Sequence, residues 1–155
     1  MCLSVYLGTS RPLSFQSPEP GQLGVEAAAW TPPPLKGRQF IYYLGRKGDG
    51  AGPLECSCLL AEHVEWTENG PLVEQDDTYS PAACPFAALR QFCDEATRDA
   101  GIATIVCDDS GGLDQVCSKD DYCEGLIRLD SISCGNLLFA GASGDTPWRV
   151  LHVVR

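Results

Sequence analysis

Positive charge is scarce in this sequence. Its 155 residues include 11 lysines and arginines against 21 aspartates and glutamates, which gives a formal net charge of -10. Proteins that bind nucleic acids need a basic surface to neutralise the phosphates, so we expect no nucleic-acid partner. The same acidic excess disfavours contact with anionic membrane surfaces.

Long apolar runs are lacking as well. No stretch approaches the roughly 18 apolar residues of a membrane-spanning helix, so we expect no membrane partner. The first segment, "MCLSVYLGTSRPL", has no basic lead and no small-residue cleavage site, unlike a secretory signal peptide. These absences predict a cytoplasmic protein.

The composition that remains is typical of a globular protein. Hydrophobic residues make up 44% of the chain and charged residues 21%, which is enough apolar material for a buried core. The length is that of one ordinary domain, so we expect residues 1–155 to form a single domain.

Alternating apolar residues predict mainly strands, joined by long loops rich in proline and glycine. Leu3, Val5 and Leu7 share one face of the first expected strand. Other strands are expected at 39–45 and 102–107, with a closing hairpin of 137–142 and 148–154. Residues 54–66 read as a strand followed by a turn, or as a longer β segment. Residues 11–38 read as an extended connection with a short helix or turn at 25–30, and 127–133 as either a strand or a short helix.

The clearest helix is expected at residues 84–100. Pro81 or Pro85 suits its first turn, and Gly101 suits the position just past its end. Its buried face holds five residues at helical spacing: Phe86, Leu89, Cys93, Ala96 and Ala100. Strands that outnumber helices, with hairpin-like neighbours, predict an α+β fold in which a mainly antiparallel sheet packs against one long helix.

Cysteine is the unusual component. The nine cysteines fall below the roughly 8–10% of a chain that marks a disulfide scaffold, and their number is odd. With no export signal, this favours free thiols, a bound metal or a redox pair over a disulfide framework. Some of the nine are expected to be inert, because free cysteine packs like a small hydrophobic residue.

The segment "GPLECSC" places Cys56 and Cys58 one residue apart. In an extended strand their side chains would share one face, with Cα atoms roughly 6.5–7 Å apart. This separation is long for a disulfide but suits two thiolates that bind one metal ion. If the segment is a turn, the geometry is open.

The sequence also offers a third sulfur and a fourth ligand for a metal ion bound by Cys56 and Cys58. Cys2 begins the first expected strand, and it would join the same patch if that strand lay beside the Cys-Ser-Cys segment. The fourth ligand would be His63, Cys107 or Asp109. Thiolates select zinc, copper(I) or an iron–sulfur cluster, although the paired Cys-x-x-Cys pattern of a zinc ribbon is absent.

Three segments carry a resemblance. They are "MCLSVYLGT" followed by "RPL", "IYYLG" before a loop that ends in "CSC", and "ALRQF" followed later by "VCDD". Together they resemble a group of small, uncharacterised bacterial proteins that begin with Met-Cys and carry a Cys-x-Cys after a Tyr-Tyr-x-Gly strand. The resemblance implies the order of the elements and the association of Cys2 with the Cys-x-Cys, and it implies no activity.

Three functions remain open at this point. We expect a small metal-binding protein in which Cys2, Cys56 and Cys58 hold zinc or another thiophilic ion, in a structural, carrier or catalytic role. The alternative is a thiol-dependent enzyme or redox protein that uses one of the same cysteines, with His63 as a base. A second alternative is a protein-binding module with inert cysteines. The sequence indicates no specific substrate or protein partner and does not decide whether the chain is an enzyme.

Overall fold

A computed structural model describes the chain over residues 3–14, 18–60, 64–67, 70–73, 85–108, 122–133, 137 and 148–155. The strands are β1 (Ser4–Thr9), β2 (Leu23–Ala27), β3 (Phe40–Arg46), β4 (Val64–Thr67), β5 (Gly70–Val73), β6 (Ala103–Asp108), β7 (Tyr122–Arg128) and β8 (Trp148–Val154). The helix α1 (Pro85–Thr97) is accompanied by the 3-10 turns η1 (Pro33–Leu35), η2 (Ser57–Leu60), η4 (Arg98–Ala100) and η6 (Leu129–Ser131).

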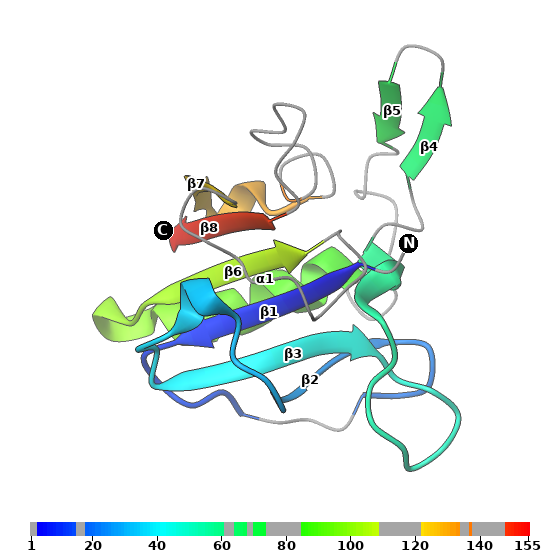
Figure 1. Cartoon of the computed structure of the whole chain (residues 1–155), viewed down its shortest axis with the longest axis horizontal. Coiled ribbons are helices and arrows are strands. Elements are labelled where there is room, and N and C mark those ends of the chain that lie inside the picture. The colour runs from blue at the N-terminus through cyan, green and yellow to red at the C-terminus, as the bar shows by residue number, and fades with distance from the viewer. Residues whose placement is uncertain are drawn as a thin grey trace.

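Six strands form one mixed sheet in the order β2-β3-β1-β6-β8-β7 (Figure 1). Four of the five neighbouring pairs are antiparallel, and only β7 and β8 run parallel. A separate two-stranded antiparallel sheet holds β4 and β5. The α+β class is therefore confirmed, and the sheet is largely antiparallel with one parallel pair.

Apolar side chains on both faces of the strands allow the sheet to pack on two sides. In β1, Val5 and Leu7 belong to the core that also contains α1, whereas Tyr6 belongs to a smaller apolar cluster. Successive strand residues point to opposite faces of the sheet, so alternate residues of β1 belong to different clusters. The expectation that Leu3, Val5 and Leu7 share a buried face is confirmed.

The helix has the predicted buried face but not the predicted length. Phe86, Leu89, Cys93 and Ala96 are all 0% exposed, and Pro85 is the first helical residue. The expectation of one long helix is wrong, since α1 has 13 residues, close to the mean of about 11–12 for globular proteins. The helix ends at Thr97, and in the following turn η4 Asp99 and Ala100 take positive φ values of 51° and 60°. Ala100, expected on the buried face, is therefore exposed.

Gly101 does follow the end of the helical segment, for a reason other than a left-handed cap. Its φ of -66° is open to any residue. A Cβ atom at this position, however, would lie 2.0 Å from the carbonyl oxygen of Ala96. Only glycine permits the chain to pass this close to the end of α1 on its way into β6.

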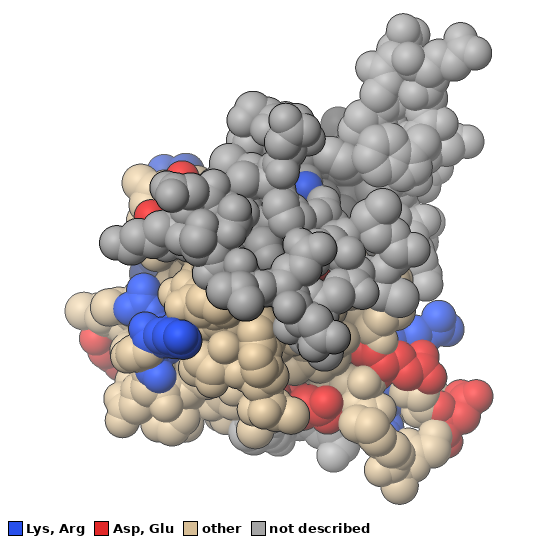
Figure 2. All heavy atoms as spheres, viewed as in Figure 1, with Lys and Arg blue, Asp and Glu red and all other residues tan. Residues whose placement is uncertain are grey.

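The face of the sheet opposite α1 carries the smaller cluster, covered by η1. The ring of Tyr6 lies 5.8 Å from that of Trp30 in an edge-on contact and 5.4 Å from that of Tyr43. Such tilted arrangements are the favourable ones for aromatic pairs. On the face shown in Figure 2, basic side chains gather at left near η1, and acidic ones lie mostly at right near the loop after β3.

Several expected elements are corrected by the strand pairing. Residues 25–30 are not a helix or turn throughout, because Val25 to Ala27 pair with β3 as part of β2. Residues 127–133 begin in β7 and then form the turn η6. The closing hairpin of 137–142 and 148–154 falls largely outside the described residues; its second strand is present as β8, which pairs with β6 and β7. Within the described residues, no helix has the length and apolar character that crossing a membrane requires.

Candidate functional site

The Cys-Ser-Cys segment is a turn, which corrects the expected strand at 54–66 over its first half. Glu55 donates its N–H to the Arg46 carbonyl oxygen at 2.8 Å, and Arg46 donates to the Cys56 carbonyl oxygen at 3.3 Å. The chain then enters η2 at Ser57. Cys56 and Cys58 therefore do not share a strand face, because a 3-10 turn rotates successive side chains by about a third of a circle.

Ser57 fastens this turn into the sheet. It is 0% exposed, and its hydroxyl accepts a hydrogen bond from the Val5 N–H at 2.8 Å. The same hydroxyl donates to the carbonyl oxygen of Leu44. Val5 and Leu44 are register partners of β1 and β3, so the serine side chain bridges the two strands at this end of their ladder.

Leu3 joins the turn to the start of β1. Its N–H donates to Sγ of Cys58 at 3.4 Å, and its carbonyl oxygen accepts from the Ser57 N–H at 3.0 Å. Leu3 is thus held to Ser57 by a backbone hydrogen bond and to Cys58, 55 positions away, by a bond to its side-chain sulfur. The Cys-Ser-Cys turn lies directly against the N-terminal end of the first strand.

Tyr43 shares the neighbourhood of both thiols. Its hydroxyl donates to the carbonyl oxygen of Glu55 at 3.1 Å. Burial is the main cause that raises the pKa of Tyr43, and the nearby Cys56, Cys58 and Glu26 raise it further, while a hydrogen bond with the Ser57 side chain lowers it. A phenol, a hydroxyl and two thiols therefore lie within electrostatic reach of one another.

The five predicted metal ligands are only partly placed. Cys2 and His63 lie outside the described residues, as does Asp109. Cys56 and Cys58 are half-buried and outside any disulfide, whereas Cys107 lies on β6 and is 2% exposed in the core beneath α1. Over the part of the chain that the structure describes, no three His, Cys, Asp or Glu side chains are grouped to hold a metal ion.

Cys93 is set apart from these candidates by its surroundings. It is 0% exposed on the inner face of α1, and burial strongly raises the pKa of its thiol. A thiol that stays protonated is neither a nucleophile nor a metal ligand. Cys93 is therefore a packing residue, as its position in the helical pattern predicts.

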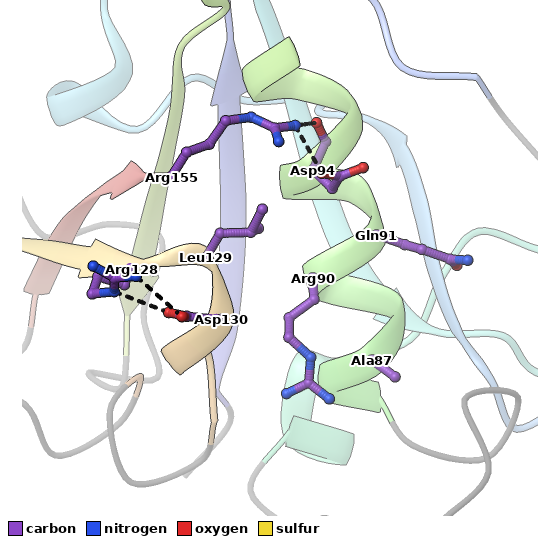
Figure 3. Close-up of a pocket in the computed structure, with 8 residues that line it drawn as sticks. All are labelled: Ala87, Arg90, Gln91, Asp94, Arg128, Leu129, Asp130 and Arg155. Atoms are coloured by element: carbon purple, nitrogen blue, oxygen red, sulfur yellow. Dashed lines mark hydrogen bonds and ion pairs between the residues drawn. The ribbon is translucent and has the colours of Figure 1, made fainter.

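A second feature, missed from the sequence, is a groove of about 690 Å³ between α1 and the end of β7 (Figure 3). Its lining contains two ion pairs. Arg155 Nη2 lies 2.7 Å from an Asp94 oxygen, and Arg128 Nε lies 3.1 Å from an Asp130 oxygen. The eight lining residues are Ala87, Arg90, Gln91, Asp94, Arg128, Leu129, Asp130 and Arg155. They come from three distant segments with no common motif, so no local pattern predicts the groove.

A third feature is a chain of polar contacts across the sheet. Arg38 Nη2 donates to the Thr104 hydroxyl at 2.9 Å, and that hydroxyl lies 3.2 Å from Nδ1 of His152. His152 Nε2 lies 2.5 Å from a Glu124 oxygen. The order hydroxyl, imidazole and carboxylate is that of a catalytic triad, but Thr104 is 0% exposed and its oxygen already accepts from Arg38. These contacts are therefore a structural network that joins Arg38, in the segment before β3, to β6, β8 and β7.

Comparison of the chain with protein-family models, with curated proteins and with solved structures found no match.

Proposed function

We propose that this protein binds a thiophilic metal ion, zinc or an ion of similar preference, through Cys2, Cys56 and Cys58. The observation that carries the proposal is the contact between Leu3 and the Cys-Ser-Cys turn, in which the Leu3 N–H donates to Cys58 Sγ. This contact brings the start of the chain to the two thiols.

Covalent geometry extends the contact to Cys2. Cys2 is bonded to the very nitrogen of Leu3 that donates to Cys58 Sγ, and consecutive Cα atoms are about 3.8 Å apart. If the Cys2 side chain is directed toward the turn, its thiol would meet that sulfur. Three thiols from two segments would then surround one point, which is the arrangement that thiophilic ions require.

The surroundings of Cys58 also suit a metal-bound sulfur. Ligand atoms in metal sites are commonly oriented by hydrogen bonds from outside the first layer, and the Leu3 N–H supplies one such bond. Ser57 anchors the turn between β1 and β3 through its hydroxyl. The thiol-bearing turn is therefore held in place before any ion binds, which lowers the entropic cost of binding.

A fourth ligand would come from His63, which follows η2 by three residues in the sequence. Cys107, the other candidate named from the sequence, is not grouped with Cys56 and Cys58, since no three described His, Cys, Asp or Glu side chains could hold an ion together. If His63 did not reach the ion, the fourth position would be open to solvent or substrate, as in catalytic zinc sites.

Elemental analysis of protein purified without chelator tests the proposal. We expect one equivalent of metal that is lost in the Cys58→Ser variant and retained in Cys93→Ala, the matched removal of a thiol from the core. Replacement by Co²⁺ should give a sulfur-to-metal absorption band in the wild-type protein and a weaker one in Cys56→Ser.

The opposite result would favour the thiol-dependent enzyme or redox protein. If the purified protein contains no metal, does not take up Zn²⁺ or Co²⁺, and one of the three thiols is alkylated rapidly at neutral pH, the metal proposal fails. A reactive thiolate of that kind titrates well below the ordinary value of about 8.5.

A further inference from the structure

Arg90 occupies an unusual position in the groove between α1 and η6. Its Nη1 donates to the carbonyl oxygen of Ile132 at 2.7 Å, and within the described residues no carboxylate lies within ion-pair distance of its guanidinium. A guanidinium has five N–H donors, so most of its hydrogen-bonding capacity is not used by described protein groups. The side chain is half-buried and is drawn along the groove in Figure 3.

The other two arginines of the groove are paired. Arg155 donates to the carbonyl oxygens of Thr97 and Asp94 as well as to the Asp94 carboxylate, which ties the C-terminal strand to α1. Arg128 pairs with Asp130, and both side chains are well exposed at 65% and 69%. An exposed pair of this kind contributes little to stability, so Arg128 can turn toward a bound anion at small cost.

The charge of the groove differs from that of the whole chain. Three of the 11 basic residues line it together with two of the 21 acidic ones, so its lining carries 3 − 2 = +1 while the protein carries -10. An acidic protein that concentrates arginines in one hollow, where one of them has no carboxylate partner among the described residues, offers a local site for a single negative charge.

We propose that this groove binds a small organic monoanion, whose carboxylate or phosphate oxygens are held by Arg90 and whose apolar part lies over Leu129 and Ala87. The planar fork of the guanidinium matches two oxygens of such a group. The volume of about 690 Å³ lies within the range of about 300–1,000 Å³ for small-molecule sites. This site shares no residue with the proposed thiol site, so the failure of either proposal leaves the other unaffected.

Benzoate and benzamide are the probes that test the charge requirement, because they have the same shape and only benzoate is an anion. Titration followed by NMR should give saturable shifts of Leu129 and the Arg90 Nε–H with benzoate and none with benzamide. Phenyl phosphate in a parallel titration distinguishes the two oxyanions. Saturation by benzamide with equal affinity, or no saturable shift with either anion, overturns the proposal.

The role of Arg90 is tested by Arg90→Gln, with Arg46→Gln on the exposed end of β3 as the matched loss of an arginine. Loss of a charged hydrogen-bond donor should weaken binding at least about tenfold, while the Arg46 variant binds as the wild type does. If Arg90→Gln fails to fold, Arg90→Lys keeps the charge and loses the fork, and it should bind several-fold more weakly. Unchanged affinity in the folded Arg90 variant contradicts the proposal.

Discussion

The backbone N–H of Leu3 donates a hydrogen bond to Sγ of Cys58, and the two residues lie 55 positions apart in the sequence. Beside this bond, the hydroxyl of Ser57 links Val5 of β1 to Leu44 of β3. The turn that carries two thiols is therefore part of the sheet's own hydrogen-bonding system rather than a loop at its surface.

Ser57→Ala should destabilise the fold. The substitution leaves the buried N–H of Val5 and the carbonyl of Leu44 without the hydroxyl between them, and an unsatisfied buried group costs about 1–3 kcal/mol. Urea unfolding measures the loss. Ser14→Ala, which removes an exposed hydroxyl, should change the free energy of unfolding by no more than about 0.5 kcal/mol. Equal effects of the two substitutions would contradict the bridging role.

Leu89→Ala should be among the costliest single changes. Leu89 is 0% exposed at the contact of α1 with the sheet, and removing a buried leucine side chain costs about 2–5 kcal/mol. Ile102→Ala is the control, because Ile102 is 46% exposed and its loss leaves no cavity. A cost for Leu89 no larger than that for Ile102 would refute the packing of α1 described above.

Tyr6 should make stability fall at alkaline pH. Burial raises the pKa of Tyr6 from 10.0 to about 12, with smaller contributions from Tyr43 and Asp108. Because the folded pKa lies above the unfolded one, this stabilisation is complete below pH 10 and is lost as pH rises through 12. Absorbance titration of tyrosinate should show a late-ionising group that is missing in Tyr6→Phe. Titration of every tyrosine near 10 would disprove this.

Asp94 should make stability fall at acidic pH, whereas Tyr6 acts at alkaline pH. Hydrogen bonds from Arg98, above all, and from Arg155 lower the pKa of its carboxyl group. Its stabilising effect is therefore present above the unfolded value of about 4 and is lost as pH falls through the lower folded value. Thermal melts between pH 7 and pH 2.5 should show a smaller acid-induced decrease in Asp94→Asn.

The control for Asp94 is Asp49→Asn, which removes the same charge from an exposed loop residue. Its melting curve should follow the pH dependence of the wild type. If the Asp94 and Asp49 variants lose the same amount of stability at every pH, the ion pairs of Asp94 with Arg98 and Arg155 do not contribute as described.

Local patterns were sufficient for the elements whose packing repeats along the chain. The alternation of Leu3, Val5 and Leu7 identified the inner face of β1, and the spacing of Phe86, Leu89 and Cys93 identified the inner face of α1. Both follow from the side-chain periods of a strand and a helix, which act over a few residues. The end of α1 at Thr97 was not visible, because the left-handed conformations of Asp99 and Ala100 that follow it carry no glycine signal in the sequence.

The sequence by itself determined the α+β class, the buried faces of β1 and α1, and the inert character of Cys93, because each depends on neighbours within a few residues. Tertiary structure alone decided the parallel pairing of β7 with β8, the docking of Cys58 on Leu3 and the grouping of Arg90 with Arg128 and Arg155. These depend on contacts between segments tens of residues apart. Such contacts are chosen by the packing of the whole sheet, since many registers satisfy the same local pattern and only one buries both faces together.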